Sequence, residues 1–258
     1  MKGRNIGLAF VLMGCSAYNA GAESQGPSAA SLVGNVFKFY SSAKSLSGTI
    51  HMTQSMENVS VTIDTALAYE GPSKIYMKQD LHSTEPHSWL ITSDGSVFTY
   101  DMPNRIRFSS TRGAPRLMEA VSPGPGVNQD FRQIFRAAKL SLGEVDIPEL
   151  IAIAGTPEMQ QVKDQLASVS FAGKSKIGDT DVAVITGDWR SDHRFPASAK
   201  FEMYVTADGQ LKRFVRKQLV AVNIPGGGQL AAQQVVTTWD VNLKVNGTPD
   251  EALFTVVK

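Results

Sequence analysis

The residue types best suited to metal chemistry gather in one short polar stretch, DLHSTEPH, at positions 80–87. Asp80, His82, Glu85 and His87 offer nitrogen and oxygen ligands at a spacing that a transition-metal ion would accept. The same residues are ordinary in a polar loop between two strands, and we favour that interpretation. The loop-like run Asp192-His193-Arg194 has the same explanation, so no metal is expected.

Signatures of nucleophilic or phosphate chemistry do not occur in the sequence. It contains no G-x-S-x-G, H-E-x-x-H or P-loop motif. The run Gly226-Gly227-Gly228 lies between two strand-like segments, so no helix N-terminus follows it to bind a phosphate. No serine or cysteine has a histidine at a recognisable catalytic spacing. The sequence therefore predicts a protein that is not an enzyme, with no catalytic residue and no cofactor.

The N-terminal segment has the composition of an export signal. Lys2 and Arg4 precede the apolar run 6–13, which is too short to span a membrane as a mature helix. This pattern predicts export to the bacterial periplasm, with residues 1–22 as the signal segment and 23–29 as a polar tether.

Two cleavage sites compete within that segment. Leu12-Met13-Gly14-Cys15 resembles a bacterial lipobox, in which cleavage precedes Cys15 and this cysteine, the only one in the chain, is lipidated. The alternative is cleavage after Ala22, at the A-x-A sequence 20–22. The first site predicts a membrane-anchored lipoprotein and the second a soluble periplasmic protein.

Length and composition bound the rest of the chain. Its 258 residues, 42% hydrophobic and 19% charged, are sufficient for one β-rich domain with a core. The formal net charge is +1, whereas a nucleic-acid-binding domain carries a strong basic excess. We therefore expect no nucleic-acid partner.

The clearest secondary-structure pattern lies in the segment 89–108, which predicts an antiparallel meander. Ser93-Asp94-Gly95-Ser96 is a turn between two β-rich runs, and Asp101-Met102-Pro103-Asn104 is the next turn. Before this meander, an apolar period of three to four predicts a helix over 32–43. Alternating patterns then predict strands over 45–56, 59–69 and 75–81.

The middle of the chain, 113–167, changes to a helical period. We expect a short helix at 114–121 and a Pro/Gly hinge at 122–126. Further helices are expected around Phe131–Ala138, over 148–154, and after the N-cap and N1 pair Thr156-Pro157. Six arginines at 105–136 are interpreted as a solvated rim, the alternative being contacts to anionic headgroups or to acids of a lid: Arg105, Arg107, Arg112, Arg116, Arg132 and Arg136.

Strands return after Ser168, with hairpin turns at 178–181 and 207–210. The total is about eleven strands, with the helices mostly inserted in mid-sheet. The predicted fold class is α+β: an open, strongly curved antiparallel sheet, an unclosed barrel, wrapped over helices, in a single domain over 30–258.

The S-D-G…Y-D-x-P meander, the hairpin around Asp208-Gly209 and the ending Pro249-Asp250-Glu251-Ala252-Leu253-Phe254 carry a resemblance to a known family. The sequence resembles the periplasmic lipoprotein-carrier superfamily of LolA, LolB and RseB, and most resembles its predicted periplasmic branch, whose function is not established. The resemblance implies an unclosed barrel whose space between sheet and helices takes up acyl chains. It therefore implies non-catalytic binding of lipid or lipoprotein at the cell envelope.

Strand parity and the expected helices assign the residues that would line such a ligand site. The strands supply Ile50, Met52, Ile63, Leu67, Ile75 and Met77; the segments after Gly113 supply Leu117, Met118, Phe131, Ile134, Phe135, Leu150 and Ile153. Methionines suit this lining because their flexible side chains repack around different ligands. The alternative is that these residues form a fully packed core. The alternative function is an envelope-stress or partner-binding recognition module of the same fold, without lipid carriage.

Overall fold

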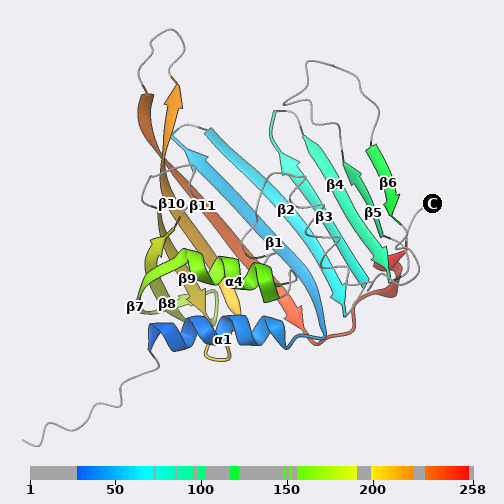
Figure 1. Cartoon of the computed structure of the whole chain (residues 1–258), viewed down its shortest axis with the longest axis horizontal. Coiled ribbons are helices and arrows are strands. Elements are labelled where there is room, and N and C mark those ends of the chain that lie inside the picture. The colour runs from blue at the N-terminus through cyan, green and yellow to red at the C-terminus, as the bar shows by residue number, and fades with distance from the viewer. Residues whose placement is uncertain are drawn as a thin grey trace, which may run out of the picture.

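One antiparallel sheet of eleven strands dominates the computed structural model (Figure 1). The structure describes residues 28–57, 59–71, 74–84, 86–95, 98–102, 117–121, 148, 151–152, 156–190, 199–223 and 230–255. The strand order is β6-β5-β4-β3-β2-β1-β11-β10-β9-β8-β7. The sheet is curved and its two edges, β6 and β7, do not pair with each other. The predicted open antiparallel sheet of about eleven strands is confirmed.

The chain starts the sheet at its centre and builds outward to one edge. These six strands are β1 (Ser45–Met56), β2 (Val59–Glu70), β3 (Lys74–His82), β4 (His87–Asp94), β5 (Phe98–Met102) and β6 (Leu117–Val121). Each strand pairs with the one before it. Glu57, between β1 and β2, takes a positive φ of 48°, which is how the chain reverses at the predicted turn.

The second half of the chain starts at the opposite edge and returns to the centre. Its strands are β7 (Leu166–Ile177), β8 (Thr180–Trp189), β9 (Ala199–Val205), β10 (Leu211–Asn223) and β11 (Leu230–Val245). The last strand, β11, pairs with the first, β1, so Ile50 lies opposite Val241. The chain between β6 and β7 therefore connects the two edges of the sheet.

Two helices lie against one face of the sheet, which we call the inner face (Figure 1). Helix α1 (Ala29–Ser41) begins at Ser28, whose hydroxyl accepts a hydrogen bond from the amide of Ser31. Its buried stripe is Ala29, Leu32, Val33, Val36, Phe37 and Tyr40. Helix α4 (Thr156–Gln165) starts at the predicted Thr-Pro pair. Both helices contact β7.

The C-terminal segment forms a 3-10 helix, η1 (Glu251–Phe254), beside β3 and β4. The side chain of Asp250 caps it by accepting a hydrogen bond from the amide of Ala252. Phe254 is buried, and Lys74 Nζ lies 2.9 Å from Glu251 Oε2. The ending that contributes to the family resemblance thus attaches the chain terminus to the sheet.

A glycine permits the close contact at the centre of the sheet. Gly48 in β1 has a φ of +146°, and a Cβ built on it would lie 2.0 Å from the carbonyl oxygen of Asn242 in β11. Such a distance is far inside van der Waals contact, so only glycine fits here.

One predicted element is wrong. The segment predicted as a helix at 114–121 contains strand β6, which pairs with β5 so that Leu117 lies opposite Met102. Leu, Met, Glu and Ala are strong helix formers, but pairing at the sheet edge overrides that preference. The third meander strand predicted around Ile106 and Phe108, the hinge 122–126 and the helix around Phe131 lie outside the described residues.

Candidate functional site: the inner face of the sheet

Six apolar side chains of the predicted site share the inner face on three adjacent strands. Ile50 and Met52 come from β1, Ile63 and Leu67 from β2, and Ile75 and Met77 from β3. The register places Met52 opposite Ile63, and Leu67 opposite Met77. All six are buried, Met77 completely. We call this set the apolar strip. Strand parity predicted that these residues share a face, and the structure brings them together there.

Polar side chains interrupt the apolar strip at one level. Thr65 in β2, Gln79 in β3 and Trp89 in β4 are opposite one another in register. Gln79 Nε2 donates to Thr65 Oγ1 at 3.0 Å, and Trp89 Nε1 donates to Gln79 Oε1. These bonds satisfy polar groups that burial would otherwise penalise. Gln79 and Trp89 join the site although the parity argument, which considered only apolar residues, left them out.

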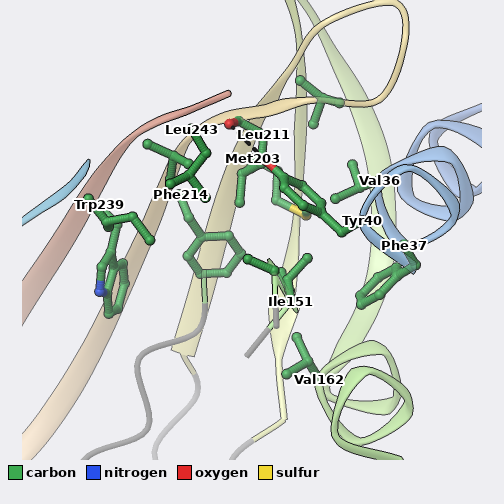
Figure 2. Close-up of a cluster of buried hydrophobic side chains, with 14 of the residues drawn as sticks. Val36, Phe37, Tyr40, Ile151, Val162, Met203, Leu211, Phe214, Trp239 and Leu243 are labelled. Atoms are coloured by element: carbon green, nitrogen blue, oxygen red, sulfur yellow. Dashed lines mark hydrogen bonds between the residues drawn. The ribbon is translucent and has the colours of Figure 1, made fainter. Parts of the chain in front are cut away.

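The helices fill the inner face over the other half of the sheet. Figure 2 shows Val36, Phe37 and Tyr40 of α1 and Val162 of α4 gathered with side chains of β9, β10 and β11. The rings of Phe201, Trp189 and Trp239 lie within 5.8–5.9 Å of that of Phe214. This half of the inner face is a packed core.

Tyr40 fixes α1 to the sheet within that core. Its hydroxyl donates to the carbonyl oxygen of Leu211 at 3.5 Å, between helix and strand β10 (Figure 2). Burial raises the pKa of the Tyr40 hydroxyl well above its usual range. The side chain is therefore a neutral anchor, not an acid or base for chemistry.

The facing surface predicted for the ligand site is only partly described. Leu117 and Met118 lie in strand β6 and not in a helix, so their part in a ligand site stays a prediction. Ile151, beside the predicted pair Leu150 and Ile153, is helical and fully buried. The remaining predicted residues lie outside the described residues: Phe131, Ile134, Phe135, Leu150 and Ile153.

Two carboxylates on β2 and β3, Asp64 and Asp80, take part in side-chain hydrogen bonds. Asp64 in β2 accepts from His51 Nδ1 at 2.5 Å and from His82 Nε2 at 2.8 Å. These bonds, that from His51 foremost, hold the pKa of the Asp64 carboxyl below its usual value. Hydrogen bonds from Ser88 and then Lys78 lower the pKa of Asp80 in the same way.

The two histidines considered as metal ligands, His82 and His87, lie at strand ends. His82 ends β3 and binds Asp64, and His87 begins β4. Within the described part of the chain, no group of three His, Cys, Asp or Glu side chains is arranged to hold a metal ion. Among the same residues, no helix has the length and apolar character needed to cross a membrane.

Arg216 and Trp239 are two inner-face residues that the sequence argument missed. Arg216 in β10 shares the parity of buried Phe214, and its Cζ lies 5.6 Å from the ring centroid of Trp239 in β11. A cation at the same parity as the apolar Phe214 was the signal that could have identified it.

No family model matches the sequence, and no curated protein matches it. Among solved structures, the chain resembles LprF from Mycobacterium bovis at a TM-score of 0.43 and 13% identity, over 86% of this chain and 96% of that one. It also resembles MucB from Pseudomonas aeruginosa, solved in complex with MucA, at a TM-score of 0.43 and 11% sequence identity. That match covers 89% of this chain and 61% of the MucB chain. A LolA superfamily protein from Nitrosomonas europaea matches at a TM-score of 0.27 and 10% sequence identity, over 89% of this chain and 98% of that chain.

At such identities the likeness concerns the fold alone. The superfamily predicted from the sequence is represented among these structures, and its predicted periplasmic branch is not distinguished from the others.

Proposed function

We propose that this protein binds the acyl chain of a lipid or lipoprotein on the inner face of its sheet, at the bacterial cell envelope and without catalysis. The observation that carries the proposal is the apolar strip. Its side chains lie on β1 to β3, whereas the buried side chains of α1 and α4 in Figure 2 gather with those of β9, β10 and β11. An acyl chain is the kind of ligand that such an elongated apolar surface fits.

The energetics favour a ligand that binds reversibly. Each CH₂ group removed from water contributes about 0.8 kcal/mol, so a chain of about fifteen carbons supplies roughly 10 kcal/mol gross. Met52 and Met77 are already buried, so a ligand must replace existing contacts and retains only part of that sum. Flexible methionine side chains lower the cost of this rearrangement.

The proposed location follows from the N-terminal segment. A positive start, an apolar run and two cleavage sequences support export. Lipidation at Cys15 would place the inner face close to a membrane, the source of acyl chains. Cleavage after Ala22 would instead release a soluble periplasmic carrier.

Native mass spectrometry of the protein purified from membranes tests the proposal. A mass increment that extraction with organic solvent identifies as lipid is the expected result. Binding of cis-parinaric acid, whose fluorescence rises in an apolar site, is the solution counterpart. A clean protein mass together with no parinaric acid binding would overturn the proposal.

A second candidate is a recognition module that binds a protein partner without lipid. Edge strand β7 favours it, because Phe171 on this strand is 49% exposed and the outer edge of β7 borders no other strand in the sheet order. An extended partner segment adds to such an edge by main-chain hydrogen bonds. Capture of an envelope protein that Phe171→Asp abolishes, with a lipid-free mass, supports this candidate over the first.

A further inference from the structure

The bend that follows β11 at the centre of the sheet contains an asparagine followed by a glycine. Asn246 and Gly247 are both exposed to solvent. No other asparagine of the sequence precedes a glycine. An asparagine side chain in this position can react with the main-chain nitrogen of the next residue, and glycine hinders that attack least because it has no side chain.

Asn246 also connects the end of β11 to the start of β1. Its main-chain N–H donates to the carbonyl oxygen of Ser45 at 2.9 Å, and its side-chain Oδ1 accepts from the N–H of Lys44 at 2.9 Å. Its φ of 56° lies in the left-handed region, which asparagine tolerates better than most residues. The backbone conformation therefore accounts for the asparagine.

The backbone conformation does not account for the glycine that follows. Gly247 is not among the glycines with a positive φ, and a Cβ built on it would meet nothing within 4 Å. An alanine would fit at this position. The glycine therefore leaves Asn246 chemically reactive where the fold would accept a residue that protects it.

The hydrogen bonds around the bend act on this reaction in opposite directions. The N–H of Lys44 polarises the Cγ=O bond of Asn246 and can stabilise the negative charge that develops on Oδ1 during an attack on Cγ. The hydroxyl of Ser45 donates to the carbonyl oxygen of Gly247 at 2.5 Å and restrains the glycine. We therefore expect the folded protein to react, although more slowly than the unfolded chain.

We propose that Asn246 is a site of spontaneous modification, at which a succinimide forms with Gly247. The Gly247 nitrogen loses its proton to solvent and bonds to Cγ of Asn246, and the Cγ–Nδ2 bond breaks to release ammonia. Water then opens the ring. Opening at Cγ gives aspartate, and opening at the main-chain carbonyl carbon gives isoaspartate. This modification is independent of acyl-chain binding.

The two products should differ in their effect on the sheet. Aspartate keeps an oxygen where Oδ1 was, so it can still accept from the N–H of Lys44. Isoaspartate adds a carbon to the main chain and removes it from the side chain, so the bonds to Lys44 and Ser45 should no longer form together. The isoaspartyl form should therefore loosen the junction between α1, β1 and β11.

Peptide mapping of the aged protein tests the proposal. The folded full-length protein is incubated in mildly alkaline buffer and digested, and mass spectrometry detects the change from amide to acid. Labelling by an isoaspartyl methyltransferase identifies the second product. We expect conversion at Asn246 and none at Asn242, which is exposed on the same strand but precedes Leu243.

Two variants assign the reaction and its effect. Gly247→Ala should slow the conversion about tenfold, which corresponds to about 1.4 kcal/mol of barrier, and it should fold because the new Cβ meets nothing within 4 Å. Asn246→Asp reproduces the aspartyl product alone. The aged parent should have a lower Tm than fresh Asn246→Asp, because it contains isoaspartate as well.

Three results would overturn the inference. Asn246 that stays intact in the folded protein, while the urea-unfolded chain reacts, would show that the hydrogen bonds protect it. Equal conversion at Asn242 would show that the glycine does not select the site. Gly247→Ala that ages as fast as the parent would exclude attack by an unhindered glycine nitrogen. The proposed function stands in each case.

Discussion

Asp64 on β2 accepts a hydrogen bond from His51 on β1, with 2.5 Å between Oδ1 and Nδ1, and its other oxygen binds His82. This pairing lowers the pKa of Asp64. A lowered carboxyl pKa adds stability that is fully present above the unfolded-state value of about 3.8 and is lost as the pH falls through the folded-state value.

Asp64→Asn should therefore reduce the free energy of unfolding at neutral pH and have little effect in acid. Because these side chains are about half exposed, we expect a loss below about 1 kcal/mol. Urea titrations of parent and variant at pH 7 and at pH 3 measure the difference. A loss that is equal at both pH values would contradict the assignment to the Asp64 charge.

Met77→Glu should weaken acyl-chain binding and destabilise the fold. Met77 is completely buried, and a charge placed in a sealed core costs several kcal/mol. We expect at least tenfold weaker binding of cis-parinaric acid and a loss of about 3–5 kcal/mol in urea unfolding. Tyr76→Glu, at the next position and on the outer face, is the control and should change probe affinity less than twofold.

A folded Met77→Glu variant with the probe affinity of the parent would show that acyl chains do not bind at the apolar strip. Should the glutamate prevent folding, Met77→Thr introduces a smaller polar group at the same position and gives the same comparison.

Two glycine-to-alanine substitutions should have opposite effects on stability. At Gly48 the new Cβ meets the carbonyl oxygen of Asn242 at 2.0 Å and φ is +146°, so Gly48→Ala should cost roughly 3 kcal/mol or more. At Gly34, inside α1, a Cβ finds nothing within 4 Å, and Gly34→Ala should stabilise by about 0.5–1 kcal/mol. Thermal unfolding of both variants checks the signs. Equal effects would refute the close contact between β1 and β11.

Cys15→Ser tests whether the protein is anchored. If the lipobox is used, the parent takes up radiolabelled palmitate and the variant does not, and the variant precursor stays uncleaved or is cut after Ala22. N-terminal sequencing and labelling in bacteria measure both. An unlabelled parent that begins at Glu23 would show that Cys15 is only part of the signal.

The sheet could be predicted from the sequence because local signals agreed with the final pairing. In 45–56 and 59–70 apolar residues recur at alternate positions, interrupted by Gln54 and Thr65, and a turn separates the two runs. The bounds of β1 are those predicted. The helix predicted at 114–121 failed because its residues are good helix formers, whereas the hydrogen bonds that decide the structure come from β5, a separate segment.

The candidate site also has one part that the sequence predicted and one part that it did not. Alternation within each strand identified the apolar side chains of one face, Ile50 and Met52 on β1 and Met77 on β3, because alternation is a local property. The contact of Arg216 with the ring of Trp239 joins two neighbouring strands, and parity along one strand does not give the register of its neighbour. The hydrogen bond from Gln79 to Thr65 escaped prediction for the same reason.

The pairing of the first strand with the last has a consequence for how this protein folds. Until β11 is available, β1 has an unpaired edge in the middle of the future sheet. Pairing between distant parts of a chain is slow, and open strand edges invite aggregation in the meantime. The incomplete chain therefore needs chaperones to prevent its aggregation until its C-terminal segment is available. Truncation before β11 would remove the centre of the sheet rather than an edge.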